Sequence, residues 1–170
     1  MNPPKQNINM RIGTALHGAI LENKGIDGFT NKQLIIISNM VNAVLSSYEW
    51  EMVTCEPFKV EQEHYWSLHG IDCKGIIDLE SESRIIDVKS ISDIGRVEQN
   101  INNYKYKYQL AWYALAMGCP DIDYDLLFVD KTINNNVELI EYRLSDLPIN
   151  ECHLLIKKFK TIKHKIITEF

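Results

Sequence analysis

Two isoleucine-rich segments that each carry an aspartate, separated by a short polar loop, restrict the fold of this chain more than any other feature. Residues 75–78 read GIID, and residues 85–89 read IIDVK. Runs of β-branched residues predict strands, and the polar loop over residues 80–84 is short enough to join them as an antiparallel hairpin. The sequence therefore predicts two neighbouring strands that both carry an acidic side chain.

The pairing of this hairpin determines which side chains meet. If Leu79 pairs with Ile86, Asp78 lies directly opposite Asp87, and cross-strand partners share a face with Cβ atoms about 4.5–5.5 Å apart. Lys89 lies two residues beyond Asp87 and therefore shares that face. We expect two carboxylates and an ammonium to converge there, while three apolar side chains point the other way, into the core: Ile77, Ile86 and Val88.

Two opposed carboxylates repel each other, so some positive charge must offset the repulsion. Mg²⁺ does so with oxygen ligands at about 2.0–2.1 Å, and it keeps several waters of its own. Lys89 would then position or deprotonate a water, or stabilise developing negative charge. The alternative is an ordinary trio of ion pairs on a solvated strand. The flanking isoleucines weigh against it, because an unpaired acid on a central strand is costly.

The remaining sequence predicts a mixed sheet covered by helices, in the α/β class. Apolar spacing predicts helices over residues 11–22, 30–47, 106–117 and 150–167, with residues 93–104 helical or irregular. Period-two patterns predict strands over residues 55–68, 71–79, 85–91, 122–129 and 136–144. No repeat or linker interrupts the chain, so we expect one domain over residues 1–170, with a loose segment at 1–10 and a basic helix at 150–170.

Composition excludes several classes of protein. The chain has 170 residues, 45% of them hydrophobic and 24% charged, which is typical of a globular domain. No apolar run approaches the ~20 residues that span a bilayer, and no apolar signal core begins the chain, so we expect a cytoplasmic protein without a membrane partner. The four cysteines are scattered and form no CxxC pair, which argues against a zinc or iron–sulfur site.

Charge is unevenly distributed along the chain. The formal net charge is −5, yet the last twenty residues carry five lysines against two glutamates. An acidic body can be a solvated surface or a concentration of carboxylates around a cation. The lysines of the terminal helix are either a solvated helix face or a track for phosphates. The sequence alone leaves both alternatives open, for the acidic body and for the terminal lysines.

Three further groups of residues are candidates for the same site. Gln109 and Tyr113 are four residues apart and share a helix face, where the alternative is a polar helix edge beside a core tyrosine. His17 lies on the first predicted helix, four residues after Gly13. A glycine in a helix indicates close approach of another backbone or the start of the helix. A lone helical histidine is more often structural than a metal ligand. Glu61 and Glu63 face one side of their predicted strand, and each is either a further carboxylate of the site or part of a solvated face.

Taken in order, four motifs resemble those of a known family. Residues 13–17 read GTALH, residues 75–78 read GIID, residues 87–89 read DVK, and residues 109–113 read QLAWY. Their order and spacing resemble the PD-(D/E)XK nuclease superfamily. They are most similar to its RecB-like branch and, within it, to the exodeoxyribonuclease VIII (RecE-type) nuclease domain of phages and prophages. The YKYK run over residues 104–107 also fits, and the resemblance extends from Arg11 to about Leu144.

The resemblance implies a mixed central sheet flanked by helices and the Mg²⁺-dependent hydrolysis of DNA phosphodiesters, with Mn²⁺ as a substitute. The implied metal site comprises Asp78, Asp87, the backbone carbonyl of Val88 and His17, with Glu61 as first choice for a further acid and Glu63 as fallback. Lys89 would be the catalytic lysine. Gln109 and Tyr113 would steady it and contact the DNA backbone. The family's usual helical lead-in is absent before Arg11, which would substitute in DNA binding, and Lys105 and Lys107 are candidate phosphate contacts.

Three functional hypotheses follow from this resemblance. The first is an exonuclease on linear double-stranded DNA in phage-type recombination, acting as a homo-oligomer with a single-strand annealing protein in a bacterial host cell. The second is an endonuclease or junction-cutting enzyme with the same core. The third is a catalytically silent module that binds DNA or protein. The intact set of Asp78, Asp87 and Lys89 argues against the third hypothesis.

Overall fold

The computed structural model describes residues 7–132 and 134–168, with side chains of the last helix described as far as Thr161. Five strands form one sheet in the order β1-β2-β3-β4-β5. Their bounds are β1 Lys59–Leu68, β2 Ile71–Glu80, β3 Arg84–Ile91, β4 Asp123–Asp130 and β5 Val137–Tyr142. The pair β3–β4 is parallel, and the other neighbours are antiparallel, so the predicted mixed sheet is confirmed.

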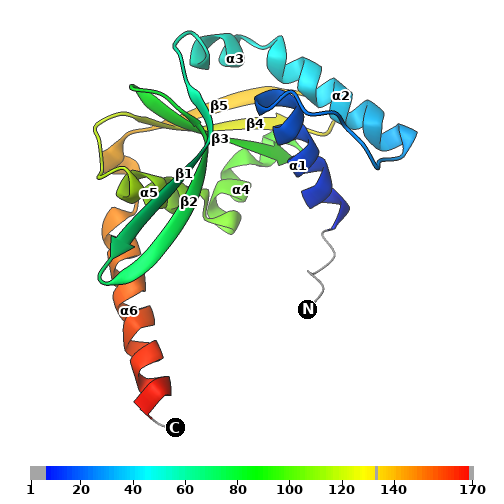
Figure 1. The fold of residues 1–170 in the computed structure, drawn as a ribbon. Helices are drawn as coiled ribbons and strands as arrows, with labels where there is room; N and C mark the ends of the chain where they lie inside the picture. The colour runs from blue at the N-terminus through cyan, green and yellow to red at the C-terminus, as the bar shows by residue number, and fades with distance from the viewer. Residues whose placement is uncertain (1–6, 133, 169–170) are drawn as a thin grey trace.

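Helices cover both faces of this sheet (Figure 1). On one face lie α1 Ile8–Leu21, α2 Asn31–Leu45 and the short α3 Tyr48–Val53. On the other lie α4 Val97–Tyr104, α5 Tyr106–Ala116 and the start of α6 Ile149–Thr168. Two short 3-10 turns, η1 Ile94–Arg96 and η2 Leu144–Asp146, complete the described elements. The β1–β2 hairpin and α6 extend together from the body (Figure 1).

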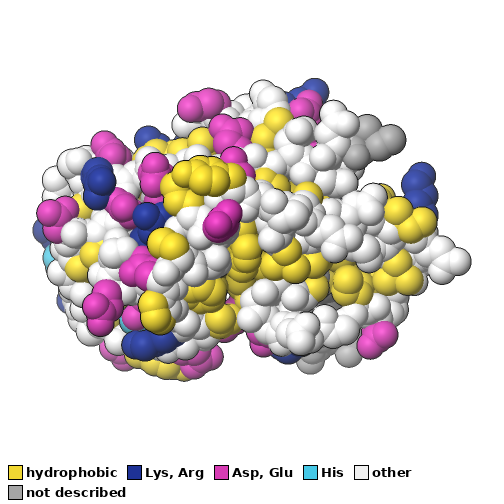
Figure 2. All heavy atoms as spheres, turned by 90° about the horizontal axis from the view of Figure 1, so that it is seen from above, with side chains coloured by type: hydrophobic (Ala, Val, Ile, Leu, Met, Phe, Trp, Pro, Cys, Tyr) yellow, Lys and Arg dark blue, Asp and Glu magenta, His cyan; other side chains and the backbone are white. Residues whose placement is uncertain are grey.

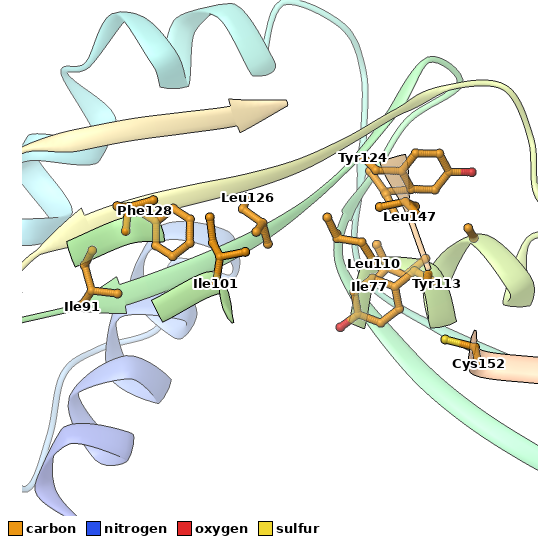
Figure 3. Close-up of a cluster of buried hydrophobic side chains, with 14 residues drawn as sticks. Ile77, Ile91, Ile101, Leu110, Tyr113, Tyr124, Leu126, Phe128, Leu147 and Cys152 are labelled. Atoms are coloured by element: carbon orange, nitrogen blue, oxygen red, sulfur yellow. The ribbon is translucent and has the colours of Figure 1, made fainter. Parts of the chain in front are cut away.

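Each face of the sheet has its own hydrophobic core. The core beneath α4 and α5 includes Tyr124 and Phe128 of β4, both with no exposed surface, and Leu110 of α5, which lies near Ile77 and Tyr113 (Figure 3). The core beneath α1 and α2 is built around Leu16 and Met40, which are also fully buried. The parallel strands β3 and β4 supply side chains to both cores, as strands buried on two faces must.

The predicted helices and strands exist, but some of their bounds differ. Helix α1 begins at Ile8 with Asn7 as its cap, so the expectation of a loose segment through residue 10 is wrong for residues 8–10, while residues 1–6 lie outside the described part. Thr30 caps α2 through a capping box with Gln33. The Thr30 side chain accepts the backbone N–H of Gln33, and the Gln33 side chain accepts the backbone N–H of Thr30. Helix α3 was not predicted: six residues are too few to display a helical period.

One prediction about the faces of β2 is wrong. Ile77 packs in the core with α5, whereas Leu79, two residues later, packs in the core with α1 and α2. Residues two apart in a regular strand share a face, so β2 changes face at Asp78. Ile86 and Val88 do share a core, but Ile77 does not join them. The distortion matters because it lies at the predicted site.

The surface shows no separation of charge on the face seen from above the sheet. There, acidic side chains are interspersed with lysine and arginine, and apolar side chains cross the middle of the view (Figure 2). Within the described part of the chain, no helix combines the length and apolar character that crossing a membrane requires.

Candidate active site

The predicted pairing of the two aspartate-bearing strands is confirmed. Leu79 pairs with Ile86 and Glu80 with Ile85, and the ladder between β2 and β3 comprises only these two pairs. Beyond it the Oδ2 of Asp78 accepts the amide N–H of Val88 at 2.8 Å. The Asp78 carboxylate thus occupies the gap between the strands rather than standing on one face, which is how it approaches Asp87 from the neighbouring strand.

Asp87 is held by three side chains on the α5 side of the sheet. Asp87 is only 1% exposed. Gln109 donates from Nε2 to its Oδ1 at 2.8 Å, and the Tyr113 hydroxyl donates to the same oxygen at 3.3 Å. The Lys89 ammonium lies 2.5 Å from Oδ2, an atom with no other polar partner among the residues that the structure describes. Gln109 also donates to the Tyr113 hydroxyl at 2.6 Å, so the predicted helical pair acts on Asp87 as a unit.

Lys89 is a buried ammonium in this arrangement. Desolvation acts to lower the pKa of Lys89, but the charge and hydrogen bond of Asp87 outweigh it and raise that pKa above its ordinary value. Its Nζ also lies 5.1 Å from the centre of the Tyr106 ring, within range of a cation–π interaction. The lysine therefore stays protonated at neutral pH, which favours the electrostatic role over that of a base.

A second group of ligand atoms surrounds Asp78. His17 Nε2 lies 2.6 Å from the Val88 carbonyl oxygen, and its Nδ1 lies 3.5 Å from Asp78 Oδ2. Ligand atoms of His17, Glu61 and Asp78 all fall within 4.8 Å of one another. Burial, reinforced by the charge of Asp87, raises the pKa of Asp78 to about 7. The close packing of α1 on β3 brings His17 here, since a Cβ on Gly13 would meet Ser90 Oγ at 3.3 Å.

The structure distinguishes the two glutamates of β1. Glu61 has φ 51°, a left-handed conformation that is uncommon for a residue other than glycine, and it lies across from Asp78 between two regular pairs. That conformation directs its carboxylate to the cluster with Asp78. Glu63 is exposed instead and binds Lys74 at 2.6 Å and the Tyr65 hydroxyl at 2.7 Å. The first choice from the sequence, Glu61, is thus the glutamate that the fold brings to the site.

The residues present fit a hard divalent cation. Two observations support this: ligand atoms of His17, Glu61 and Asp78 cluster together, and the Val88 carbonyl oxygen lies beside His17. Asp87 falls outside this cluster and pairs with Lys89 instead. Carboxylate and carbonyl oxygens suit Mg²⁺, and the added imidazole also suits Mn²⁺. Net negative charge buried among these groups is what a cation would neutralise.

An open groove of about 810 Å³ reaches part of this set, while Asp78 and Asp87 lie behind its lining. It runs between α1, the end of β3 and the α4–α5 corner, and its lining includes His17, Glu61 and Lys89. Lys131, the first residue after β4, also lines it and lies 3.5 Å from Asn9. Sequence reasoning missed Lys131 because nothing in its neighbourhood resembles a motif, and only the parallel pairing of β3 with β4 brings it there.

Other predicted contacts lie away from this groove. Arg11 donates to the Gly28 carbonyl at 2.7 Å and stacks over Phe29, on a different side of α1. Lys107 lies over the Tyr142 ring at 4.5 Å. Lys105 stands exposed at the α4–α5 corner with φ 59°. Lys160 donates to the His69 carbonyl at 3.0 Å, and the side chains of Lys163 and Lys165 lie outside the described residues.

Comparisons with known proteins locate the fold. No family model matches the sequence, and no curated protein matches it significantly. A "Putative exonuclease" from Eubacterium rectale has a similar structure, with a TM-score of 0.76 at 10% identity over 96% of this chain and 70% of that chain. A phage related exonuclease from Haemophilus somnus 129PT aligns with a TM-score of 0.42 at 13% identity over 81% of this chain and 74% of that one. The first similarity shows that this chain shares its α/β fold with that protein.

Proposed function

We propose that this protein is a metal-dependent deoxyribonuclease that hydrolyses phosphodiester bonds of linear double-stranded DNA as an exonuclease. The observation that supports the proposal is a pair of adjoining groups where two central strands separate: Asp87 binds Lys89 on β3, and Asp78 on β2 clusters with His17 and Glu61 and is acted on by the charges of the first pair. Burying two carboxylates and a lysine together lowers the stability of the fold. Such clusters are therefore typical of functional sites. The exonuclease names of the similar structures favour a nuclease over other hydrolases.

Each side chain has a distinct part in this proposal. Mg²⁺, with Mn²⁺ as a substitute, would supply positive charge to the phosphate and acidify a water. Asp78, Glu61, His17, the Val88 carbonyl and Asp87 are the groups that would hold it. Lys89 presents its ammonium to negative charge that develops on the phosphate. Gln109 and Tyr113 orient Asp87 through their hydrogen bonds and contact the DNA backbone.

The biological setting is a further part of the proposal and follows from the motif resemblance. It comprises phage-type recombination in the cytoplasm of a bacterial host, a homo-oligomer and a single-strand annealing protein as partner. The two other hypotheses retain the same core: an endonuclease cuts within DNA, and a silent module binds without cutting. The intact set of Asp78, Asp87 and Lys89 favours catalysis over the silent module.

One assay separates the three hypotheses. Purified protein is incubated with Mg²⁺ and either linear or circular duplex DNA, with Asp87→Asn as the inactive control. Loss of linear DNA alone supports the exonuclease, whereas nicking of circles supports the endonuclease. Absence of cleavage with Mg²⁺ and with Mn²⁺ would contradict the proposed function.

The two glutamates of β1 provide a matched test of the metal site. Glu61→Gln should weaken Mn²⁺ binding in calorimetry and slow cleavage by about 10–100-fold, the range typical when a group that supports a metal site is altered. Glu63→Gln should leave both unchanged, because its carboxylate is exposed and binds Lys74. Equal behaviour of the two variants would remove Glu61 from the site.

A further inference from the structure

A second hollow lies on the other side of the Asp87 environment from the groove described above. Its volume is about 670 Å³, within the usual ~300–1,000 Å³ of ligand sites. It opens between the β1–β2 hairpin, α5 and α6, and we call it the aromatic hollow. Its principal lining residues are Trp66, Gly75, Lys105, Gln109, Trp112 and Tyr113. The catalytic proposal leaves this hollow without an assigned occupant.

Tryptophans form two of its walls. The rings of Trp66 and Trp112 come from β1 and α5, with centroids 6.3 Å apart and planes inclined by 43°. The indole N–H of Trp66 is buried and has no hydrogen-bond partner among the described residues. A Cβ on Gly75 would lie 3.4 Å from the Trp66 ring and 3.6 Å from the Tyr113 ring, so both rings pack closely on this glycine.

The aromatic hollow shares a wall with the candidate active site. Gln109 and Tyr113 line the hollow, and both also donate to Oδ1 of Asp87. Asp87 itself is only 1% exposed, so these two side chains form the wall between its carboxylate and the hollow. The hollow is thus placed for a part of the substrate that adjoins the reacting bond, rather than for an independent ligand.

Charge at the rim favours a polyanion. Lys74 and Lys105 both line the hollow. Lys74 is paired with Glu63, whereas Lys105 is exposed and makes no ion pair within the described part of the chain. Flat aromatic walls with a cation at the rim are the combination that binds unpaired bases: the rings stack on bases and the lysine meets the backbone.

We propose that the aromatic hollow binds unpaired nucleotides next to the scissile phosphate, so that the substrate is DNA with a single-stranded tail or a frayed end. This inference rests on the proposed function and refines its substrate. Stacking accepts any base, so we expect little sequence preference. A single strand is favoured because a paired base has its faces covered by its neighbours in the duplex.

Binding of a short fluorescein-labelled oligothymidylate, measured by anisotropy in EDTA so that no cleavage occurs, tests this directly. Trp66→Leu keeps an apolar side chain against Gly75 but removes the stacking surface, and it should weaken binding about tenfold. The matched control is Tyr48→Ala, which removes an aromatic ring that is 73% exposed on α3, and it should bind as the wild type does. Lys105→Asn, which suits the left-handed backbone, should reduce the salt dependence by about 0.7 in slope.

The outcomes separate this inference from the proposed function. Equal affinity of wild type, Trp66→Leu and Lys105→Asn, or no binding by the wild type, would overturn the assignment of the hollow, even if the wild type cleaves DNA. If circular dichroism shows that Trp66→Leu is unfolded, Lys105→Asn alone decides. Trp66-dependent binding in a protein that cleaves no DNA would preserve the hollow and contradict the nuclease. A hollow that accepts a peptide instead would leave oligothymidylate affinity unchanged in both variants.

Discussion

Replacement of Lys89 by methionine should slow DNA cleavage about a thousandfold, because it removes a preorganised positive charge that a largely buried side chain holds in place. The Nζ atom lies 2.5 Å from Asp87 Oδ2, and the Lys89 side chain is only 18% exposed. Methionine matches the length of the lysine stem, so packing against Tyr106 is largely retained. The measurement is the rate of release of nucleotides from linear duplex DNA in Mg²⁺.

The same substitution should lower the free energy of unfolding by about 3 kcal/mol in EDTA, because it leaves Asp87 charged and buried without its cation. Adding Asp87→Asn to the Lys89→Met variant should restore much of the lost free energy of unfolding, while the rate of DNA cleavage stays low. Lys24→Met is the control, since it removes a solvent-exposed pair with Glu22 worth under about 1 kcal/mol. A Lys89→Met variant with wild-type cleavage would exclude the catalytic role of this lysine.

The sequence predicted the core of this site because the relevant information is local. Loop length and alternation determine that Leu79 pairs with Ile86, and the i, i+4 spacing places Gln109 and Tyr113 together. These short-range rules identified the strands, the helix and the acidic pair. They left Glu61 and Glu63 equal, and only the resemblance put Glu61 first.

The parts that sequence reasoning missed depend on distortions and on long-range packing. The change of face at Asp78 accompanies the left-handed backbone of Glu61, and neither residue type signals such a conformation in advance. Arg11 was expected to bind DNA, yet the rotation of α1 on the sheet directs it to Gly28. Lys131 reaches the groove only through the parallel pairing of β4 with β3. Tertiary contacts, not local pattern, decide such positions.

Asp78→Asn should make the protein more stable and inactive at once. In EDTA, the variant loses the repulsion between Asp78 and Asp87, while an amide oxygen can still accept the Val88 N–H. We expect a gain of about 1 kcal/mol, or about 2–4 °C in Tm for a chain of this size. Cleavage should fall about a thousandfold, because the neutral amide no longer helps to hold a cation. Such opposition between stability and activity is typical of residues retained for function.

Metal-dependent melting tests the reason for this opposition. A cation that binds only the native state stabilises it by about 2.7 kcal/mol at a hundredfold excess over its Kd. Addition of Mg²⁺ or Mn²⁺ should therefore raise the Tm of the wild type by several degrees and leave that of Asp78→Asn nearly unchanged. Asp72→Asn, an exposed substitution on the same strand, should retain the full rise. Two results would show that the buried carboxylates serve some purpose other than cation binding. One is a wild-type Tm that changes with neither metal, and the other is an Asp78→Asn variant whose Tm rises as much as that of Asp72→Asn.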